Sequence, residues 1–218
     1  MPNQDAVVGV EVEEQFFTEE QQRHVATLGM WIFLASELLL FSALFLSALT
    51  LRILHPDGVT AAALHLKFWI GATNTAVLIL SSFTMSVAIE ASKMGWQKPM
   101  VLFMRITATL GMIFLALKGY EYYRDYAEHM TPFLSWRDYD LRGNPSSQLF
   151  VNLYYIITAL HGAHLSIGIG IVLVMASQAS APGYLKRRQN RIEITGLYWH
   201  FIDVIWIIVF PTLYLVNR

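Results

Sequence analysis

The chain has 218 residues, of which 55% are hydrophobic and only 14% are charged. A soluble domain carries about a quarter charged residues, so this composition favours a membrane protein over a protein with a large water-facing surface. The formal net charge of −1 gives no basic excess for binding nucleic acid. The chain has no cysteine, which excludes disulfides, cysteine-ligated metal sites and thiol nucleophiles within it.

The beginning of the chain is polar and acidic. A secretory signal would place basic residues before a short apolar core, and residues 1–27 lack that arrangement. We therefore expect the first apolar run to remain as a true membrane span. An acidic N-terminal segment over residues 1–24 would precede one membrane domain over residues 25–218.

Five apolar segments follow, each near or above the roughly 20 residues that a helix needs to cross a bilayer. Strands of a membrane barrel would be shorter and would alternate polar with apolar residues, so we expect helices. The predicted fold class is all-α: a polytopic membrane protein with a bundle of five transmembrane helices. The predicted spans cover residues 25–51, 68–91, 101–123, 149–177 and 195–216.

Polar connections that contain helix-breaking residues separate the spans. They include residues 55–58, 93–99, 124–148 and 182–188. An odd number of spans puts the two termini on opposite sides, and the distribution of Lys and Arg favours a cytoplasmic N-terminus with the C-terminus outside. The basic residues that would then lie inside are Arg23, Lys93, Lys98, Lys186, Arg187, Arg188 and Arg191.

Several ionisable residues lie within the predicted spans, where each costs about 2.5–3.5 kcal/mol on insertion scales. Residues three apart on a helix share a face. Lys118 and Glu121, toward the outer end of the third span, could therefore pair directly. Four other ionisable residues lie near the middle of their spans, and we expect a polar layer near the midplane that links the first, fourth and fifth spans. These residues are Glu37, His161, His164 and Asp203, and His200 shares a helix face with Asp203.

Three interpretations of this layer remain open. Its groups could be structural links between helices, each worth roughly 0.6–2 kcal/mol, or they could mark a proton or ion path. A metal or haem site is the least favoured, because His161 and His164 share one face of one helix and cannot bracket a haem. The chain also has no Glu-x-x-His pair of the di-iron kind. No catalytic motif of a soluble enzyme is present, so no catalytic residue is assigned.

Aromatic residues near the span ends are predicted to anchor the helices at the membrane interfaces. Small residues of the fourth span, Gly162-Ala163 and Gly168-x-Gly170, are predicted to permit close helix contact. Such patterns are common in polytopic proteins and identify no function. The aromatic residues are Tyr120, Tyr122, Tyr123, Tyr154, Tyr155, Trp199 and Tyr214.

Five stretches around the polar residues form a recognisable set: 28–37 (LGMWIFLASE), 74–75 (NT), 118–122 (KGYEY), 158–164 (TALHGAH) and 198–206 (YWHFIDVIW). The last is close to the Trp-His-Phe-Val-Asp-Val-Val-Trp signature of subunit III of haem-copper respiratory oxidases. The fourth resembles that family's Thr-Gly-x-His-Gly-x-His element, with Ala159 where glycine is usual. The first resembles its first-helix motif with a buried glutamate. The resemblance covers roughly residues 24–216 and is to the five-helix form of the family.

This resemblance implies a non-catalytic subunit that binds no redox centre of its own. It would pack directly on oxidase subunit I, which holds the haems and copper, and support stability and proton uptake in a complex that reduces oxygen and pumps protons. The seven-helix form holds phospholipid in a cleft that needs two helices absent here. The wider partners implied are subunit II, other oxidase subunits, membrane lipids and a respiratory supercomplex, in the bacterial inner (plasma) membrane.

The leading hypothesis is subunit III of a cytochrome c oxidase. Subunit III of a quinol oxidase, an accessory subunit of nitric oxide reductase and a stand-alone small transporter remain as alternatives. We expect Glu37 to be hydrogen-bonded to a histidine of the fourth span. The candidate functional residues, none of them assigned to catalysis, a cofactor or a metal, are Glu37, Lys118, Glu121, His161, His164, Trp199, His200 and Asp203.

Overall fold

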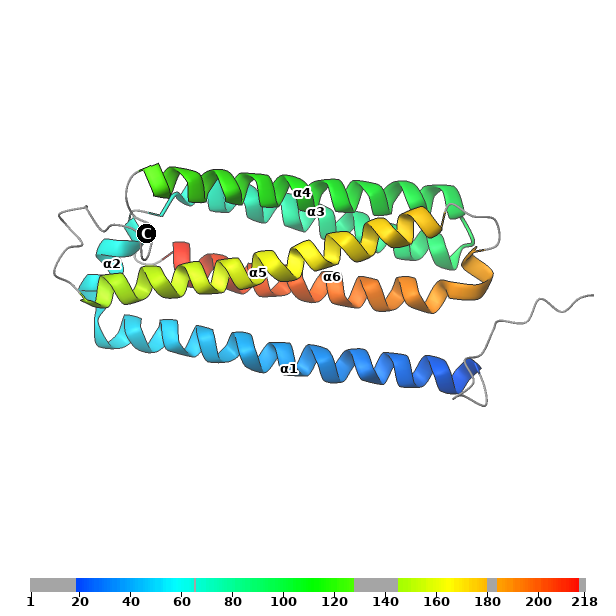
Figure 1. Cartoon of the computed structure of the whole chain (residues 1–218), viewed down its shortest axis with the longest axis horizontal. Helices are drawn as coiled ribbons and strands as arrows, with labels where there is room; N and C mark the ends of the chain where they lie inside the picture. Colours follow the sequence, from blue (N-terminus) through cyan, green and yellow to red (C-terminus); the bar gives the residue numbers. More distant parts are fainter. Residues whose placement is uncertain (1–18, 65, 128–144, 180–183, 216–218) are drawn as a thin grey trace, which may run out of the picture.

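The computed structural model describes residues 19–64, 66–127, 145–179 and 184–215. Within these ranges the chain is all-α, with five long helices and one short helix (Figure 1). The five long helices are each long and apolar enough to cross a membrane, which confirms the predicted fold class. The helices are α1 (Glu19–Leu54), α2 (Pro56–Leu64), α3 (Phe68–Lys93), α4 (Gln97–Ala127), α5 (Pro145–Gln178) and α6 (Tyr184–Tyr214).

The helices extend beyond the predicted spans at several ends, and two prolines account for part of the difference. Pro56 begins α2 and Pro145 begins α5, although both were expected to lie in connections. The first turn of a helix does not use the N–H group that proline lacks, so proline can start a helix without loss. The sequence analysis missed α2 for this reason. Most of the predicted acidic segment, residues 1–18, lies outside the described residues.

α3 and α4 form a tight antiparallel hairpin. The turn depends on Gly95, whose φ of 77° lies in a region that L-residues rarely adopt. Two backbone hydrogen bonds close the turn. The N–H of Trp96 donates to the carbonyl oxygen of Ala91 at 2.8 Å, and the N–H of Gly95 donates to the carbonyl oxygen of Ser92 at 3.2 Å. The hairpin has the most extensive helix–helix contact in the described chain.

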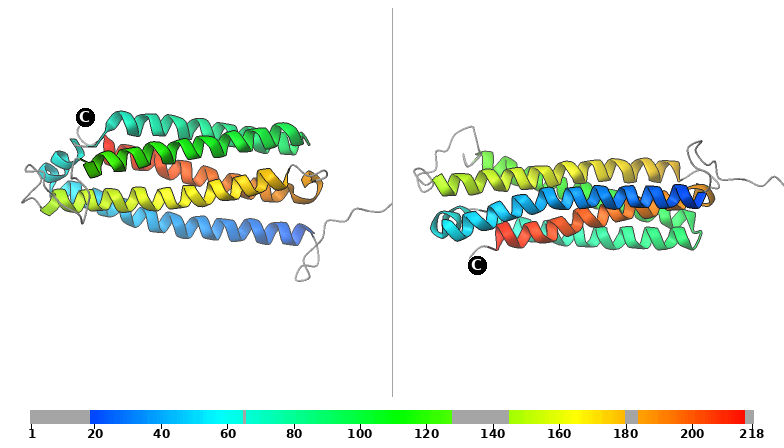
Figure 2. Two further views of the ribbon diagram at one scale, coloured as in Figure 1. Left: turned by 45° about the horizontal axis from the view of Figure 1, so that its top comes forward. Right: turned by 90° about the horizontal axis from the view of Figure 1, so that it is seen from below.

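The bundle has α1 at one edge, the α3–α4 hairpin at the other, and α5 and α6 between them (Figure 2). α1 starts and α6 ends at opposite ends of the bundle (Figure 1). The short helix α2 packs where α5 begins, and the hydroxyl of Ser147 donates a hydrogen bond to the carbonyl of Gly58 at 2.7 Å. This arrangement places Lys118 and Glu121 of α4 against Tyr154 of α5 and Tyr214 of α6.

Trp199 lies in the interior of the bundle and is fully buried. Its indole N–H donates to Ser81 Oγ at 3.2 Å. Two glycines make room for the ring, because a Cβ added at Gly111 would lie 3.0 Å from Trp199 and one at Gly168 would lie 3.4 Å from it. The prediction that Trp199 is an interfacial anchor is therefore wrong. Gly168 does permit close packing, whereas a Cβ at Gly170 would meet nothing within 4 Å.

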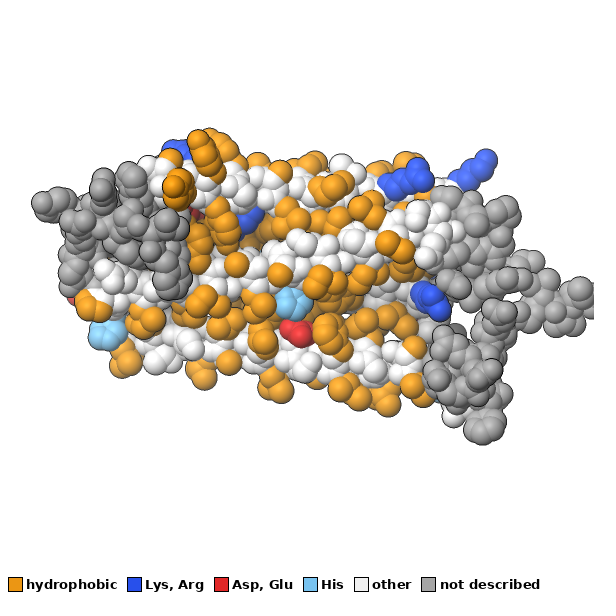
Figure 3. Space-filling model, viewed as in Figure 1, with side chains coloured by type: hydrophobic (Ala, Val, Ile, Leu, Met, Phe, Trp, Pro, Cys, Tyr) orange, Lys and Arg blue, Asp and Glu red, His pale blue; other side chains and the backbone are white. Residues whose placement is uncertain are grey.

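The outer surface is apolar along most of the length of the bundle (Figure 3). Figure 3 also shows Lys and Arg side chains near the end at which α1 begins, and an acidic side chain beside a histidine midway along the face of α1 and α5. Five spanning helices with an apolar exterior make this a multi-pass membrane protein.

Candidate functional site

A buried ion pair lies within α4 near one end of the bundle. Lys118 Nζ is 3.0 Å from Glu121 Oε2, one helical turn away. Lys118 is 4% exposed and Glu121 is fully buried. The predicted pairing of Lys118 with Glu121 is confirmed. Because both side chains are buried, both charges must be stabilised by protein groups instead of by water.

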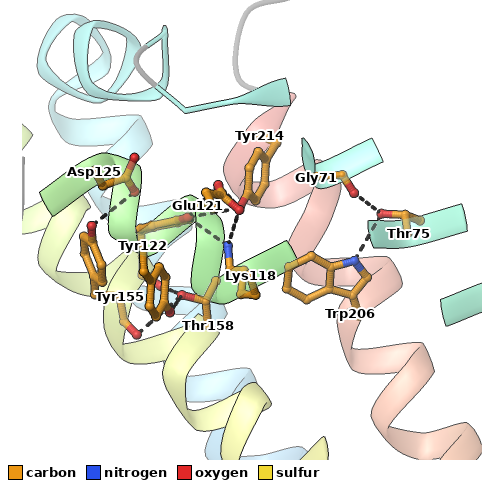
Figure 4. Close-up of polar contacts among 11 residues, drawn as sticks. Gly71, Thr75, Lys118, Glu121, Tyr122, Asp125, Tyr155, Thr158, Trp206 and Tyr214 are labelled. Carbon is orange, nitrogen blue, oxygen red and sulfur yellow. Dashed lines mark hydrogen bonds and ion pairs between the residues drawn. The ribbon is translucent and has the colours of Figure 1, made fainter. Parts of the chain in front are cut away.

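Two tyrosines complete this pair and join it to the neighbouring helices. The hydroxyls of Tyr154 on α5 and Tyr214 on α6 donate to Glu121 Oε1 at 2.9 Å and 2.8 Å. Lys118 Nζ in turn donates to both hydroxyl oxygens. Figure 4 shows Lys118, Glu121 and Tyr214 converging between their helices. We call Lys118, Glu121, Tyr154 and Tyr214 the four-residue network.

The four-residue network corrects the prediction for two aromatic residues. Tyr154 and Tyr214 were expected at the membrane interface, but both are buried and bonded to Glu121. Tyr120 and Tyr123, by contrast, are 54% and 68% exposed and keep the outward position expected of anchors. A tyrosine near a span end can point either way, and its partner on another helix decides which.

Further polar contacts join α4 and α5 beside the network (Figure 4). Tyr155 donates its hydroxyl hydrogen to Asp125 Oδ2 at 3.1 Å, and the hydroxyls of Tyr122 and Thr158 are 2.6 Å apart. The sequence analysis missed Asp125. It follows Glu121 by four residues, so the spacing that places residues on one helix face would have found it.

A second polar contact links α1 to α5 at mid-membrane. Glu37 Oε2 lies 3.0 Å from His164 Nε2, and the two side chains are 18% and 15% exposed. The predicted hydrogen bond between Glu37 and a histidine of the fourth span is confirmed. His164 Nδ1 lies 2.8 Å from the carbonyl oxygen of Leu160, which can only accept, so Nδ1 carries a hydrogen. His164 therefore bonds along its own helix through Nδ1 and across to Glu37 of α1 through Nε2.

His161 does not join that pair. It is 1% exposed, and neither ring nitrogen has a hydrogen-bond partner among the described residues. Its ring instead packs against Trp206, with ring centroids 5.0 Å apart, and against Phe114 at 5.6 Å. Although it is only three residues from His164, it points into the core of the bundle.

His200 and Asp203 lie on a different side, in a pocket of about 420 Å³ between α3 and α6. His200 Nδ1 is 2.8 Å from Ser82 Oγ, and its Nε2 is 3.4 Å from Ser86 Oγ. The prediction of one polar layer linking the first, fourth and fifth spans is therefore wrong for Asp203, which faces α3, and for His161. It holds only for Glu37 with His164. Ser82 and Ser86, which were missed, share one face of α3 at a spacing of four residues.

Among the described residues, no three His, Cys, Asp or Glu side chains are grouped so that they could hold a metal ion. The polar residues instead form three separate sets: the four-residue network, the Glu37–His164 pair and the α3–α6 pocket.

Comparison with known proteins gives the family. The family model described as cytochrome c oxidase subunit III matches residues 11–217. The chain belongs to the cytochrome c oxidase subunit III family. It is similar to "Cytochrome c oxidase subunit 3" of Alkalihalophilus pseudofirmus, with 33% identity over 87% of this chain and 86% of the relative.

Two further relatives show the range of the subunit III family. The chain is 34% identical to "Cytochrome c oxidase subunit 3" of Thermostichus vulcanus, over 88% of this chain and 87% of the relative. It is also 30% identical to "Probable quinol oxidase subunit 3" of Staphylococcus haemolyticus, over 87% of this chain and 88% of the relative. The match to the subunit III family spans all three polar sets, from Glu37 to Tyr214.

The four-residue network predicts an asymmetric response to mutation. Lys118→Met leaves the Glu121 carboxylate buried without its cation, which should lower the stability of the folded subunit by about 3–5 kcal/mol. The double change Lys118→Met with Glu121→Leu removes both charges and should recover much of that loss, since the hydroxyls of Tyr154 and Tyr214 already lie 3.1 Å apart. The measurement is the temperature at which the subunit unfolds in detergent-solubilised membranes.

The matched control is the Lys93–Glu90 pair of α3, which has the same sequence separation at 3.9 Å but side chains 49% and 58% exposed. Glu90→Gln should change stability by less than about 1 kcal/mol. A double variant no more stable than Lys118→Met would contradict this account of the network.

Proposed function

We propose that this chain is the non-catalytic subunit III of a proton-pumping haem-copper oxidase in aerobic electron transport. In this role it packs on oxidase subunit I, whose haems and copper reduce oxygen, and it supports stability and proton uptake. The observation that carries the proposal is the family match over residues 11–217 combined with five membrane-spanning helices. Subunit II, other oxidase subunits and membrane lipids are its further partners.

The arrangement of the three polar sets favours a structural role for this chain over a transport path through it. The four-residue network is closed, because its charged and hydroxyl groups bond to one another across α4, α5 and α6. Such internal links hold helices in register. The α1–α5 pair and the α3–α6 pocket lie on other helix pairs and are not joined to the network by any hydrogen bond among the described residues.

The electron donor that we propose is cytochrome c, and the second candidate is a quinol. Relatives of similar identity carry both names: 33% and 34% for the two cytochrome c oxidase subunits and 30% for a probable quinol oxidase subunit. The donor binds to other subunits in this proposal, so activity of the purified complex decides between the two.

Purification of the complex through an affinity tag on this chain tests the proposed function. We expect the tagged chain to bring down haem-containing polypeptides, and the preparation to consume oxygen with reduced cytochrome c as donor. Consumption with a quinol alone would assign the second candidate. Recovery of the chain without haem from membranes that contain the oxidase would contradict both.

The Glu37–His164 pair predicts a defect in sustained turnover. Glu37→Ala removes the bond between α1 and α5, whereas Glu37→Gln keeps an oxygen and an amide within reach of His164 Nε2. We expect the alanine variant to lose activity faster than wild type during continuous turnover while its haem absorbance stays unchanged. The glutamine variant, as the control, should lie closer to wild type. Loss of haem absorbance in Glu37→Ala would contradict a role separate from the redox centres.

We propose that the chain lies in the bacterial plasma membrane with a cytoplasmic N-terminus, as the distribution of Lys and Arg favours. The chain has no cysteine, so single cysteines can report its sidedness. Asp57 on α2 and Met94 in the α3–α4 turn are exposed at opposite ends of the bundle. A membrane-impermeant maleimide should label Asp57→Cys in intact spheroplasts and Met94→Cys only after lysis. The reverse pattern would invert the topology.

A further inference from the structure

Four polar side chains form a row along the seam between α3 and α6. Ser82 and Ser86 lie about one turn apart on α3. His200 and Asp203 lie about one turn apart on α6, and all four side chains line the α3–α6 pocket. Ser82 and Asp203 are close to the middle of the membrane spans formed by α3 and α6. We call these four residues the polar row, and it contains both ionisable residues that line the pocket.

The hydrogen bonds around His200 define its tautomer. Ser86 donates its hydroxyl hydrogen to the carbonyl oxygen of Ser82 at 3.1 Å, so its oxygen accepts from His200 Nε2 at 3.4 Å. Nε2 therefore carries a hydrogen, and Nδ1 accepts from the Ser82 hydroxyl at 2.8 Å. Since Ser82 gives its one hydrogen to the imidazole, the lone pairs of its oxygen remain available as an acceptor.

Asp203 stands at the inner end of the polar row. It is 4% exposed, and neither carboxyl oxygen makes a close hydrogen bond among the described residues. The Ser82 hydroxyl is the hydrogen-bonding group beside this carboxyl. A buried carboxyl group in hydrocarbon is far less costly when it carries its proton, and a protonated carboxyl is a donor. Ser82 then supplies the acceptor, and the hydrogen bonds run in one direction, from Asp203 through Ser82 to His200.

The polar row continues toward the end of the bundle at which α3 ends and α6 begins. Glu90 follows Ser86 by four residues, and Glu193 precedes His200 by seven, so each lies on the helix face that carries the polar row. The Glu90 side chain is 58% exposed and lies 3.9 Å from Lys93, the last residue of α3. The seam therefore has carboxylates near the membrane interface, where they exchange protons with water.

The other side of Asp203 is different. Thr75 lies about two turns before Ser82 on α3, and its hydroxyl donates to the carbonyl oxygen of Gly71 at 2.9 Å. The same hydroxyl oxygen accepts from the indole N–H of Trp206 at 3.1 Å. Among the described residues of the pocket, the row of linked groups thus reaches Asp203 from one end of the bundle only.

We propose that the polar row is a proton relay, and that it makes Asp203 a proton-binding site that exchanges with one side of the membrane, the side at which α1 and α6 begin (Figure 1). In the outward step, Asp203 passes its proton to the oxygen of Ser82 while Ser82 passes its own hydrogen to His200 Nδ1. The Nε2 hydrogen leaves past Ser86 to a carboxylate or to water at the interface. Asp203 becomes a carboxylate, His200 stays neutral with its hydrogen on Nδ1, and one proton is released.

The inward step is the reverse, and it restores the neutral carboxyl group. Because the relay ends at mid-membrane, it exchanges protons with one side and conducts none across the bilayer. It goes beyond the proposed function, and only the name of the side, cytoplasmic, depends on the proposed topology.

Infrared measurement of hydrogen–deuterium exchange in the purified complex tests the relay. The C=O stretch of a protonated carboxyl group is separate from the amide bands and shifts on deuteration, and Asp203→Asn identifies the band of Asp203. We expect His200→Phe to slow deuteration of this band about tenfold, an added barrier of about 1.4 kcal/mol, because the ring fills the same space without its nitrogens. Equal rates in wild type and His200→Phe would overturn the proposal, as would an Asp203→Asn spectrum that loses no protonated carboxyl band.

Two variants of Ser82 separate the relay from the fold. Ser82→Ala removes the hydroxyl that joins Asp203 to His200 and should slow the exchange as His200→Phe does. Ser82→Thr keeps a hydroxyl there and should exchange at a rate close to that of wild type. If His200→Phe fails to assemble, judged by the haem recovered with the tagged chain, this pair carries the test. Equally slow exchange in both Ser82 variants would mean a structural effect and would overturn the relay.

Thr75→Val is the positional control, because it removes a hydroxyl from the same pocket on the far side of Asp203. Its exchange rate should match wild type, whereas Ser86→Ala should exchange more slowly. Slow exchange in Thr75→Val with a normal rate in Ser86→Ala would place the access route on the other side and overturn the proposal. Absence of haem from the wild-type preparation would remove the proposed function alone, since the exchange is measured on this chain's own carboxyl group.

Discussion

The structure depends most on one carboxylate that has no access to water. Glu121 receives hydrogen bonds from Lys118 of its own helix, from Tyr154 of α5 and from Tyr214 of α6. Hydrocarbon offers no substitute partner, so each of these bonds must be made by the protein. Three helices that have only weak apolar preference for one another in lipid are thereby fixed in rotation and depth.

Once α4, α5 and α6 are fixed, the packing around Trp199 follows. Gly111 of α4 and Gly168 of α5 approach the Trp199 ring of α6 so closely that a Cβ at either position would press on neighbouring side chains. Dispersion between these surfaces is the main attraction available inside a bilayer. Polar contacts select the register, and close packing at the glycines stabilises it.

Two other carboxyl groups lie at mid-membrane, and they have opposite surroundings. Glu37 has its partner within the chain, His164, and the pair is only partly exposed. Asp203 is more deeply buried, but neither of its oxygens has a partner among the described residues. Both groups face the same cost in hydrocarbon.

The sequence by itself determined the number of spans, the all-α class and the Lys118–Glu121 pair, because helix length and a spacing of three residues are local properties. It did not determine which way Tyr154, Tyr214 and Trp199 point, nor that His161 and His164 diverge and that Asp203 faces α3. Those outcomes depend on how each helix is rotated against its neighbours. Only the tertiary structure fixes that rotation, because partners that are distant in sequence must satisfy each buried polar group.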